Sequence, residues 1–200
     1  MSLKEQEILQ EFAASQAILK GHFILSSGLH SDTYMQCARV LMDAKRAGRL
    51  CFELAKKITE KLGKNFADIV VSPAMGGVVV GYEMGRQLDL PAIFCERVNG
   101  EFELRRGFKL PEQARVLVVE DVITTGKSSL ETFNLVKKIG GTVVAEACLV
   151  DRSGEDLEKK LQVKVVSLLK IDVKTFDENN VPESLKNVPA IKPGSRFLVK

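Results

Sequence analysis

Short, wholly apolar runs recur along much of this chain, and amphipathic segments separate them. The apolar runs predict strands over residues 67–72, 91–96, 115–120, 142–150 and 164–171. Residues 78–88, residues 156–161 and the stretch after Gly126 repeat apolar side chains at helical spacing. A strand that is apolar on both faces must be covered on both, which is typical of a parallel sheet between helices. We therefore predict an α/β fold whose ligands bind beyond the carboxyl ends of the strands.

The two ends of the chain do not follow this alternation. Ser2 and Glu5 form a capping box that predicts a helix reaching as far as Gly21. The stretch HFILSSGLHSDTYMQCARVL, residues 22–41, then predicts two short strands around a turn of Ser, Gly and Asp. Residues 177–196 are polar and rich in Pro, so we predict a loop and a tail there.

The charge balance argues against nucleic acid and membrane surfaces as partners. The net charge is +3 and Lys and Arg form no run, whereas either partner usually requires a concentrated basic face. Hydrophobic residues make up 45% of the chain and charged residues 28%, as in ordinary globular proteins. The N-terminus lacks the apolar core of a signal peptide, and no segment has the length of a membrane span. We expect a single domain, residues 1–200, in the cytoplasm.

The cysteines and histidines do not predict a metal site. The chain has four cysteines with no CxxC pair and only two histidines. That spacing does not fit a structural zinc site or a disulfide framework. We expect buried, reduced thiols at Cys37, Cys51, Cys95 and Cys148.

The segment VLVVEDVITTGKSS, residues 116–129, places two carboxylates directly before a possible phosphate loop. It is not a nucleoside-triphosphatase loop, because GxxxxGK[ST] needs Gly at position 121, where the chain has Asp. It predicts a strand that ends in Glu120 and Asp121, then a turn whose N–H groups and hydroxyls hold a phosphate monoester at a helix start. Carboxylates beside a phosphate must face a neutral or cationic group. The vicinal hydroxyls of a ribose, or Mg²⁺ held by oxygen ligands, meet that requirement.

This order of apolar strand, two acids and a loop rich in Thr, Gly and Ser resembles the phosphoribosyl pyrophosphate signature of the type I phosphoribosyltransferases. Among these, three further segments are similar to the orotate phosphoribosyltransferases. HFILSSGLHSDTY is similar to the hood over the base, and VSPAMGGV, residues 71–78, to the pyrophosphate loop. CLVDR, residues 148–152, is similar to the strand end that carries an Arg for orotate.

The resemblance extends over nearly the whole chain. ERVNGEFELRRGF, residues 96–108, is similar to the family's mobile catalytic loop, and KPGSR, residues 192–196, to a late segment. The implied fold is a parallel sheet with helices on both faces and a small hood, formed by about residues 1–40 and the C-terminal tail.

The resemblance implies transfer of the 5-phosphoribosyl group from phosphoribosyl pyrophosphate to orotate, giving orotidine monophosphate and pyrophosphate. It also implies Mg²⁺, held mainly by substrate oxygens rather than by protein ligands. The ribose hydroxyls are assigned to Glu120 and Asp121, and the base to Arg152 with Thr124. The residues implied for the 5-phosphate are Thr124, Thr125, Gly126, Lys127 and Ser128. Those implied for the hood and the pyrophosphate loop are Ser26, Ser72, Ala74, Met75 and Gly76.

The chain departs from the family's pattern at places where many relatives carry lysine. These positions lie in the hood, in the pyrophosphate loop and directly after Arg97, and hold Ser26, Met75-Gly76 and Val98. We therefore assign stabilisation of the leaving pyrophosphate to Arg97, Arg105 and Arg106, with Asp121 as the remaining catalytic residue. The resemblance further implies a homodimer in which the loop of residues 97–107 reaches the partner's site.

Two alternatives stay open at this level. A relative on the same fold could act on a purine or on another pyrimidine base. A catalytically silent nucleotide sensor on this fold could instead regulate transcription. It would require a nucleic-acid-binding face, and the charge pattern offers none.

Overall fold

The computed structural model describes residues 5–25 and 28–193, and its largest element is a six-stranded sheet. The strand order is β5-β4-β3-β6-β7-β8, and all neighbouring pairs are parallel except the edge pair β4 and β5. The strands are β3 (Ile69–Pro73), β4 (Ala92–Val98), β5 (Glu101–Leu104), β6 (Arg115–Ile123), β7 (Thr142–Asp151) and β8 (Lys164–Lys170). The predicted parallel α/β sheet is confirmed.

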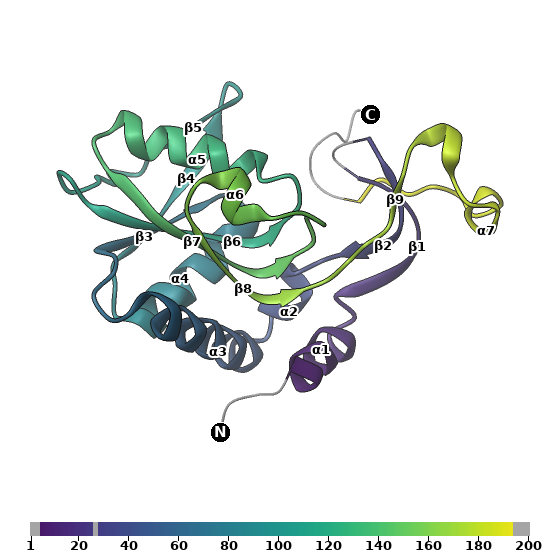
Figure 1. Ribbon diagram of the computed structural model, residues 1–200, viewed down its shortest axis with the longest axis horizontal. Helices are drawn as coiled ribbons and strands as arrows, with labels where there is room; N and C mark the ends of the chain where they lie inside the picture. The colour runs from purple at the N-terminus through teal and green to yellow at the C-terminus, as the bar shows by residue number, and fades with distance from the viewer. Residues whose placement is uncertain (1–4, 26–27, 194–200) are drawn as a thin grey trace.

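Helices cover both faces of this sheet (Figure 1). One face carries α3 (Ala44–Leu62) and α4 (Gly76–Leu88), whose apolar side chains join the largest core cluster together with α1 (Glu5–Ala14) and α2 (Ala38–Leu41). The other face carries α5 (Lys127–Lys138) and α6 (Leu157–Leu161), which pack against smaller clusters. In the described part of the chain, no helix is long and apolar enough to cross a bilayer.

The order of the strands creates a switch point between β3 and β6. From β3 the chain crosses through α4 to β4 on one side, and β6 leads through α5 to β7 on the other. Two loops therefore diverge from the carboxyl ends of adjacent strands. In open α/β sheets this is the place where ligands bind.

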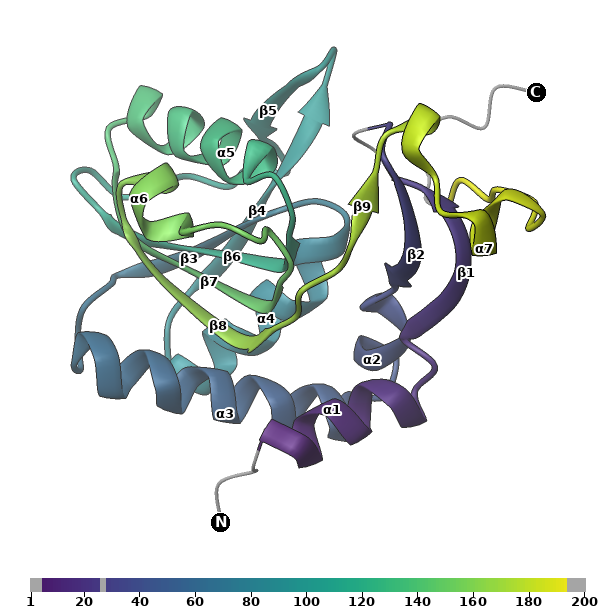
Figure 2. The same cartoon turned by 45° about the vertical axis from the view of Figure 1, so that its right-hand side comes forward.

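A second, three-stranded sheet is built from both ends of the chain. It contains β1 (Ile18–Ile24), β2 (His30–Met35) and β9 (Thr175–Phe176), in the order β1-β2-β9. Figures 1 and 2 show it beside the carboxyl ends of the core strands. We call this sheet, with the described residues that follow β9, the hood. The two strands predicted within residues 22–41 are present, although β1 begins earlier and the end of the stretch forms α2 instead of strand.

The predicted N-terminal helix is too long. Its Ser2 cap lies outside the described residues, and α1 ends at Ala14 instead of near Gly21. Gln16 adopts a left-handed conformation with φ of 52°, which stops the helix. Leu19, expected on the helix, instead pairs with Tyr34 across β1 and β2.

The prediction of a loop and a tail for residues 177–196 is partly wrong. Residues 177–193 contain a 3-10 turn at Glu178–Asn180 and the short helix α7 (Glu183–Lys186), and β9 directly precedes them. The return of this segment to the hood is held by backbone bonds between Ile24 and Ile191, at 2.8 Å, and between Ile191 and His22, at 2.9 Å. His22 also contacts Val188 O through Nδ1 at 2.9 Å and His30 through Nε2 at 2.6 Å. Because Val188 O only accepts, His22 Nδ1 carries the proton of that bond.

The segment predicted as a catalytic loop, residues 97–107, has a more regular backbone than a loop, because most of it forms a hairpin. Val98 pairs with Glu101, so Asn99 and Gly100 form a two-residue turn, with φ of 49° and 94°. Positive φ at both positions is the reason that Asn-Gly favours tight hairpins. The Asn-Gly pair was visible in the sequence and should have predicted two paired strands.

Candidate active site

The loops after β3 and β6 meet at the switch point, where a glycine is packed directly against a carboxylate. A Cβ added to Gly76 would lie 2.7 Å from both carboxylate oxygens of Asp121. Any other residue would therefore push the start of α4 away from β6. The loop before Gly76 contains a cis peptide bond between Ala74 and Met75, the pair that the resemblance singles out. Two segments far apart in sequence thus form one continuous surface.

Ser72 lies behind this surface rather than on it. Its side chain is buried, and a Cβ on Gly81 of α4 would come within 2.3 Å of Ser72 Oγ. Ser72 therefore lets α4 approach β3 closely, whereas Met75 is exposed at the rim of the loop. The structure brings Gly76 to the acids and keeps Ser72 in the packing beneath.

The two acids lie inside the last part of β6, which continues to Ile123, and not at its end as predicted. Side chains alternate along a strand, so they point to opposite faces. Asp121 points to the α4 side, where it meets Gly76. Glu120 is buried and pairs in register with Cys148 on the α5 side. The two carboxylates therefore flank the edge of the sheet from both sides.

Burial raises the pKa of Asp121 above its ordinary value, and the hydrogen bond from Val122 N to Oδ1, at 2.9 Å, lowers it in part. The Cys37 thiol donates to the main-chain oxygen of Asp121 at 3.9 Å. This contact joins the end of β2 and the start of α2 to the acid. The hood and the core sheet therefore meet at Asp121.

The predicted phosphate loop connects β6 to the N-terminus of α5. Thr124 and Thr125 are exposed, and Gly126 takes a left-handed conformation with φ of 70°. Gly126 provides no side-chain cap for this helix end, and Lys127 N makes one long bond, at 3.4 Å, to Thr125 Oγ1. The N–H groups that follow and the positive helix end are therefore available to an anion. Lys127 is exposed above the loop, and the Ser128 main-chain oxygen accepts a bond from Thr132 at 2.9 Å.

Arg152 follows β7 and is buried at the junction with the hood. Its N–H donates to Ile123 O at 3.0 Å, which fixes its backbone beside the end of β6. Within residues 5–25 and 28–193, its guanidinium has no hydrogen bond or ion pair. Burial lowers the pKa of Arg152, and nearby Tyr34 and Cys37 raise it in part. A buried cation without a counter-ion is poised for an anionic ligand.

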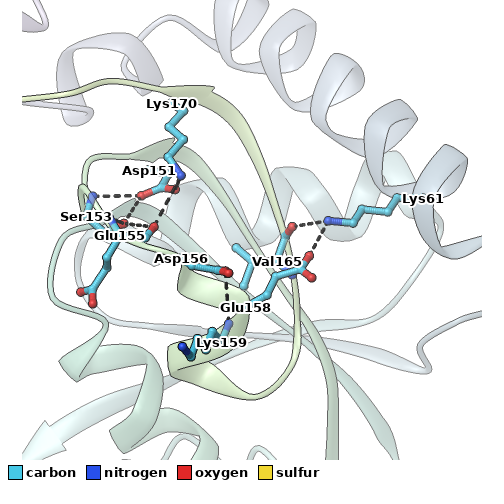
Figure 3. Close-up of polar contacts among 9 residues, drawn as sticks. All are labelled: Lys61, Asp151, Ser153, Glu155, Asp156, Glu158, Lys159, Val165 and Lys170. Atoms are coloured by element: carbon cyan, nitrogen blue, oxygen red, sulfur yellow. Dashed lines mark hydrogen bonds and ion pairs between the residues drawn. The ribbon is translucent and has the colours of Figure 1, made fainter.

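The turn that carries Arg152 is anchored by its neighbour Asp151 (Figure 3). The N–H and the hydroxyl of Ser153 donate to Asp151 Oδ1 at 2.9 and 2.7 Å. Lys170 approaches Asp151 Oδ2 at 3.5 Å from β8. Further along, Glu158 accepts from Lys61 and from Val165 N, and these bonds lower the pKa of Glu158 to about 2. The backbone around Arg152 is therefore held on both sides.

Tyr34 is a site residue that the sequence reasoning missed. It lies on β2 of the hood, and burial raises its pKa, with further contributions from Asp121, which raises it, and Arg152, which lowers it. The phenol is therefore close to both charged groups. The segment HSDTY was assigned to the hood, but alternation along β2 alone did not indicate which side chain faces the core sheet.

The three predicted arginines are not equivalent. Arg97 donates to Glu131 on α5 and to Gly100 O, and lies over the ring of Phe102 at 4.3 Å. Arg106 makes two bonds with Glu96, at 2.8 and 2.9 Å. Arg105 is exposed, and within the described residues its side chain makes no hydrogen bond or ion pair, whereas its main-chain oxygen accepts from Phe108 N at 2.9 Å. The structure therefore does not bring these arginines to Asp121, and Ser26 lies outside the residues that it describes.

Comparison with known proteins supports the same family. A family model for the phosphoribosyl transferase domain matches residues 40–187. The orotate phosphoribosyltransferase of Erythrobacter litoralis is 54% identical over 97% of this chain and 99% of its own length. The orotate phosphoribosyltransferase of Maricaulis maris is 48% identical over 98% of this chain and 100% of its own length.

Solved structures agree in fold. The crystal structure of orotate phosphoribosyltransferase from Aeropyrum pernix has a TM-score of 0.66 and 28% identity, covering 82% of this chain and 93% of that chain. Adenine phosphoribosyltransferase from Thermoanaerobacter pseudethanolicus has a TM-score of 0.60 and 25% identity, covering 70% and 88%. The fold is therefore shared by enzymes named for different bases. The resemblance expected from the motifs is confirmed, and the chain belongs to the phosphoribosyltransferase family, alongside its orotate phosphoribosyltransferases.

Proposed function

We propose that this protein transfers the 5-phosphoribosyl group from phosphoribosyl pyrophosphate to orotate, giving orotidine monophosphate and pyrophosphate. The observation that carries the proposal is one continuous edge at the switch point. It joins an uncapped helix start, two carboxylates and a buried, unpaired guanidinium. The proposal also agrees with the names of relatives about half identical over the full chain.

The substrate's phosphate and ribose fit the end of β6. The 5-phosphate lies on the first N–H groups of α5, with hydroxyl donors from Thr124, Thr125 and Ser128. The 2- and 3-hydroxyls of the ribose donate to Glu120 and Asp121, which approach from opposite faces of the sheet. The carboxylates then lie near the ring in which positive charge develops.

Little covalent chemistry is asked of the protein. The bond between ribose C1 and the pyrophosphate oxygen breaks, and its electron pair leaves with pyrophosphate. The nitrogen lone pair of the base forms the new bond to C1. Because the ribose becomes oxocarbenium-like in between, fixed charges and positioning supply most of the rate enhancement.

Arg152 and Tyr34 explain why an anionic base is preferred. A guanidinium fork binds a carboxylate through two parallel hydrogen bonds, and orotate carries a carboxylate that uracil lacks. Because Arg152 is buried, it has little water to compensate for a missing ligand carboxylate. We assign Arg152 to the orotate carboxylate, and Tyr34 to the wall of the base pocket.

Mg²⁺ is the metal that we propose for the reaction. In the described structure, no three His, Cys, Asp or Glu side chains gather in a way that could hold a metal ion. The substrate instead offers diphosphate and hydroxyl oxygens, the hard donors that Mg²⁺ prefers. When bound, the ion neutralises charge on the leaving pyrophosphate. Its ligands are thus expected to be mainly substrate oxygens and water.

Two further proposals concern the extent of the catalytic unit and the location of the protein in the cell. We propose that residues 1–200 act as one catalytic unit, in which the hood closes the base pocket of the core sheet. We also propose a cytoplasmic location, which agrees with four cysteines that are all free and buried.

We further propose that the protein acts as a homodimer, with the hairpin at residues 97–107 reaching the partner's site. α4 exposes Val79 and Tyr82, Met75 is exposed directly before it, and Phe52 of α3 is exposed as well. A hollow beside them, between α3 and α4, is lined by Phe52 and Gln87 among others. A second copy covering this apolar face would lie next to Met75, and so next to the pyrophosphate loop.

Mixing two inactive variants tests the shared site. One variant carries Arg97, Arg105 and Arg106 changed to Ala, and the other carries Asp121→Asn. After joint denaturation and refolding at equal amounts, half of the dimers are mixed, and each has one site with intact acids and an intact partner hairpin. Activity should return to about a quarter of wild type. Each variant refolded alone is the control, and a mixture as inactive as the controls would show that the hairpin serves its own subunit.

Turnover with a panel of bases tests the reaction itself. The enzyme is incubated with phosphoribosyl pyrophosphate, Mg²⁺ and orotate, uracil, hypoxanthine or adenine, and pyrophosphate release is measured. We expect release with orotate alone. Release with a purine would assign the protein to another branch of the family. A salt-dependent gel shift with DNA or RNA, together with silence toward all four bases, would favour a regulator.

A further inference from the structure

Glu146 is a buried carboxylic acid in the middle of an apolar strand, away from the ribose and base contacts described above. Its side chain is completely buried on β7, and neither carboxyl oxygen has a hydrogen-bond partner in the described structure. Glu146 pairs in register with Val118 of β6 and Val165 of β8. Val118 packs against Val136 of α5, so Glu146 lies on the α5 side of the sheet.

Among residues 5–25 and 28–193, no cation lies beside Glu146 to balance an ionised carboxylate. The buried side chains of α5 are Ser129, Thr132, Leu135 and Val136, and those of α6 are Leu157 and Leu161, none of them charged. The titratable groups that share this face are Glu120 of β6, Cys148 of β7 and Cys95 of β4. These carboxyl and thiol groups are either neutral or, after losing a proton, negative, so none of them can balance a negative charge on Glu146. An isolated buried carboxylate is costly, so the acid keeps its proton at neutral pH.

The pKa of Glu146 agrees with this geometry. Burial raises the pKa to about 8, and the nearby Ser129 side chain offsets only part of the increase. Ser129 belongs to the first turn of α5, directly after Lys127 and Ser128. Glu146 therefore lies just beneath the helix start that forms the candidate phosphate loop.

We propose that Glu146 is a positioning residue for the phosphate loop. Because it stays neutral beneath the first turn of α5, it leaves the positive helix end to the 5-phosphate. Once Glu146 is ionised, it opposes the bound phosphate dianion and weakens binding. The inference rests on the proposed function for the identity of the ligand, but any phosphate monoester at this helix start should respond to it.

Calorimetric titration with ribose 5-phosphate between about pH 7 and pH 9 tests this inference without turnover. The second ionisation of a phosphate monoester is near pH 6, so the ligand stays a dianion throughout. Loss of one proton from wild type should weaken binding by up to about tenfold across this range. Glu146→Gln keeps the shape and stays neutral, so it should bind like wild type at pH 7 and show no such loss.

Two further variants make the outcome decisive. Cys148→Ala removes the adjacent thiol and should keep the wild-type pH profile. Glu146→Val removes the carboxyl altogether and serves if Glu146→Gln does not fold, and it too should lose the pH dependence. Equal profiles for wild type and the folded Glu146 variants would overturn the inference, as would a flat wild-type profile. The base panel described above fails or succeeds independently, because it involves orotate and no Glu146 variant.

Discussion

Replacement of Asp121 by Asn is expected to slow turnover by roughly 100- to 1000-fold, the usual cost of losing one preorganised charge at a reacting centre. The amide keeps the size of the carboxylate and its packing against Gly76, so the fold should survive. It loses the negative charge beside the ribose, which matters most when the ring becomes positive. Steady-state kinetics with orotate, paired with circular dichroism, measure the effect.

A matched control for this variant lies at the other end of the neighbouring strand. Asp68 precedes β3 and pairs with Arg115, far along the strand from the switch point. Asp68→Asn should therefore turn over at nearly the wild-type rate. A folded Asp121→Asn enzyme with wild-type kcat would remove Asp121 from the reaction and move the ribose contact to Glu120.

Replacement of Arg152 by Ala is expected to raise the KM for orotate by about 30-fold or more, because loss of a buried charge partner costs about 2–5 kcal/mol. The KM for phosphoribosyl pyrophosphate should change little, since the phosphate loop and the acids remain in place. Initial rates over both substrate concentrations separate the two constants. Arg152→Lys is the matched variant, because it keeps the charge and loses the bidentate geometry. Its KM for orotate should lie between those of wild type and Arg152→Ala.

An equal increase in both KM values would contradict this assignment. It would indicate that Arg152 supports the junction between β6, β7 and the hood instead of binding the base. The Asp151 carboxylate bonds to Ser153 and Lys170, and these bonds do not involve the Arg152 guanidinium. The turn should therefore stay folded in Arg152→Ala. The thermal unfolding temperature of Arg152→Ala, compared with that of wild type, measures how much Arg152 contributes to the stability of the fold.

The sequence predicted the core sheet because its signal is local. Runs such as RVLVV are apolar on both faces, and no other common arrangement covers such strands so well. The acids and the candidate phosphate loop could be proposed for the same reason, since they lie within a single stretch of chain. What the sequence predicted less well were relations between distant segments: Gly76 packs against Asp121, and the charge of Arg152 acts on Tyr34.

The sequence-based predictions failed where a polar composition was taken to mean an irregular backbone. Residues 97–107 are polar and rich in Arg, yet Asn99-Gly100 and the alternation after it form a hairpin. The C-terminal segment is polar and rich in Pro, yet Val188 and Ile191 return to β1. Glu146 was visible as a lone acid within the run TVVAEACLV. Only the structure shows that this acid lacks a partner.

The hood draws its strands from both ends of the chain, and this has a consequence for synthesis on the ribosome. Every strand of the core sheet lies between Ile69 and Lys170, so the phosphate loop and the acids emerge together. The strand β9 and the segment that reaches Ile191 emerge only afterwards, although their partners β1 and β2 were made first. The nascent protein therefore holds two early strands without their third until β9 has left the ribosome, and the core strands that carry its phosphate site are made before the strand that completes the hood sheet.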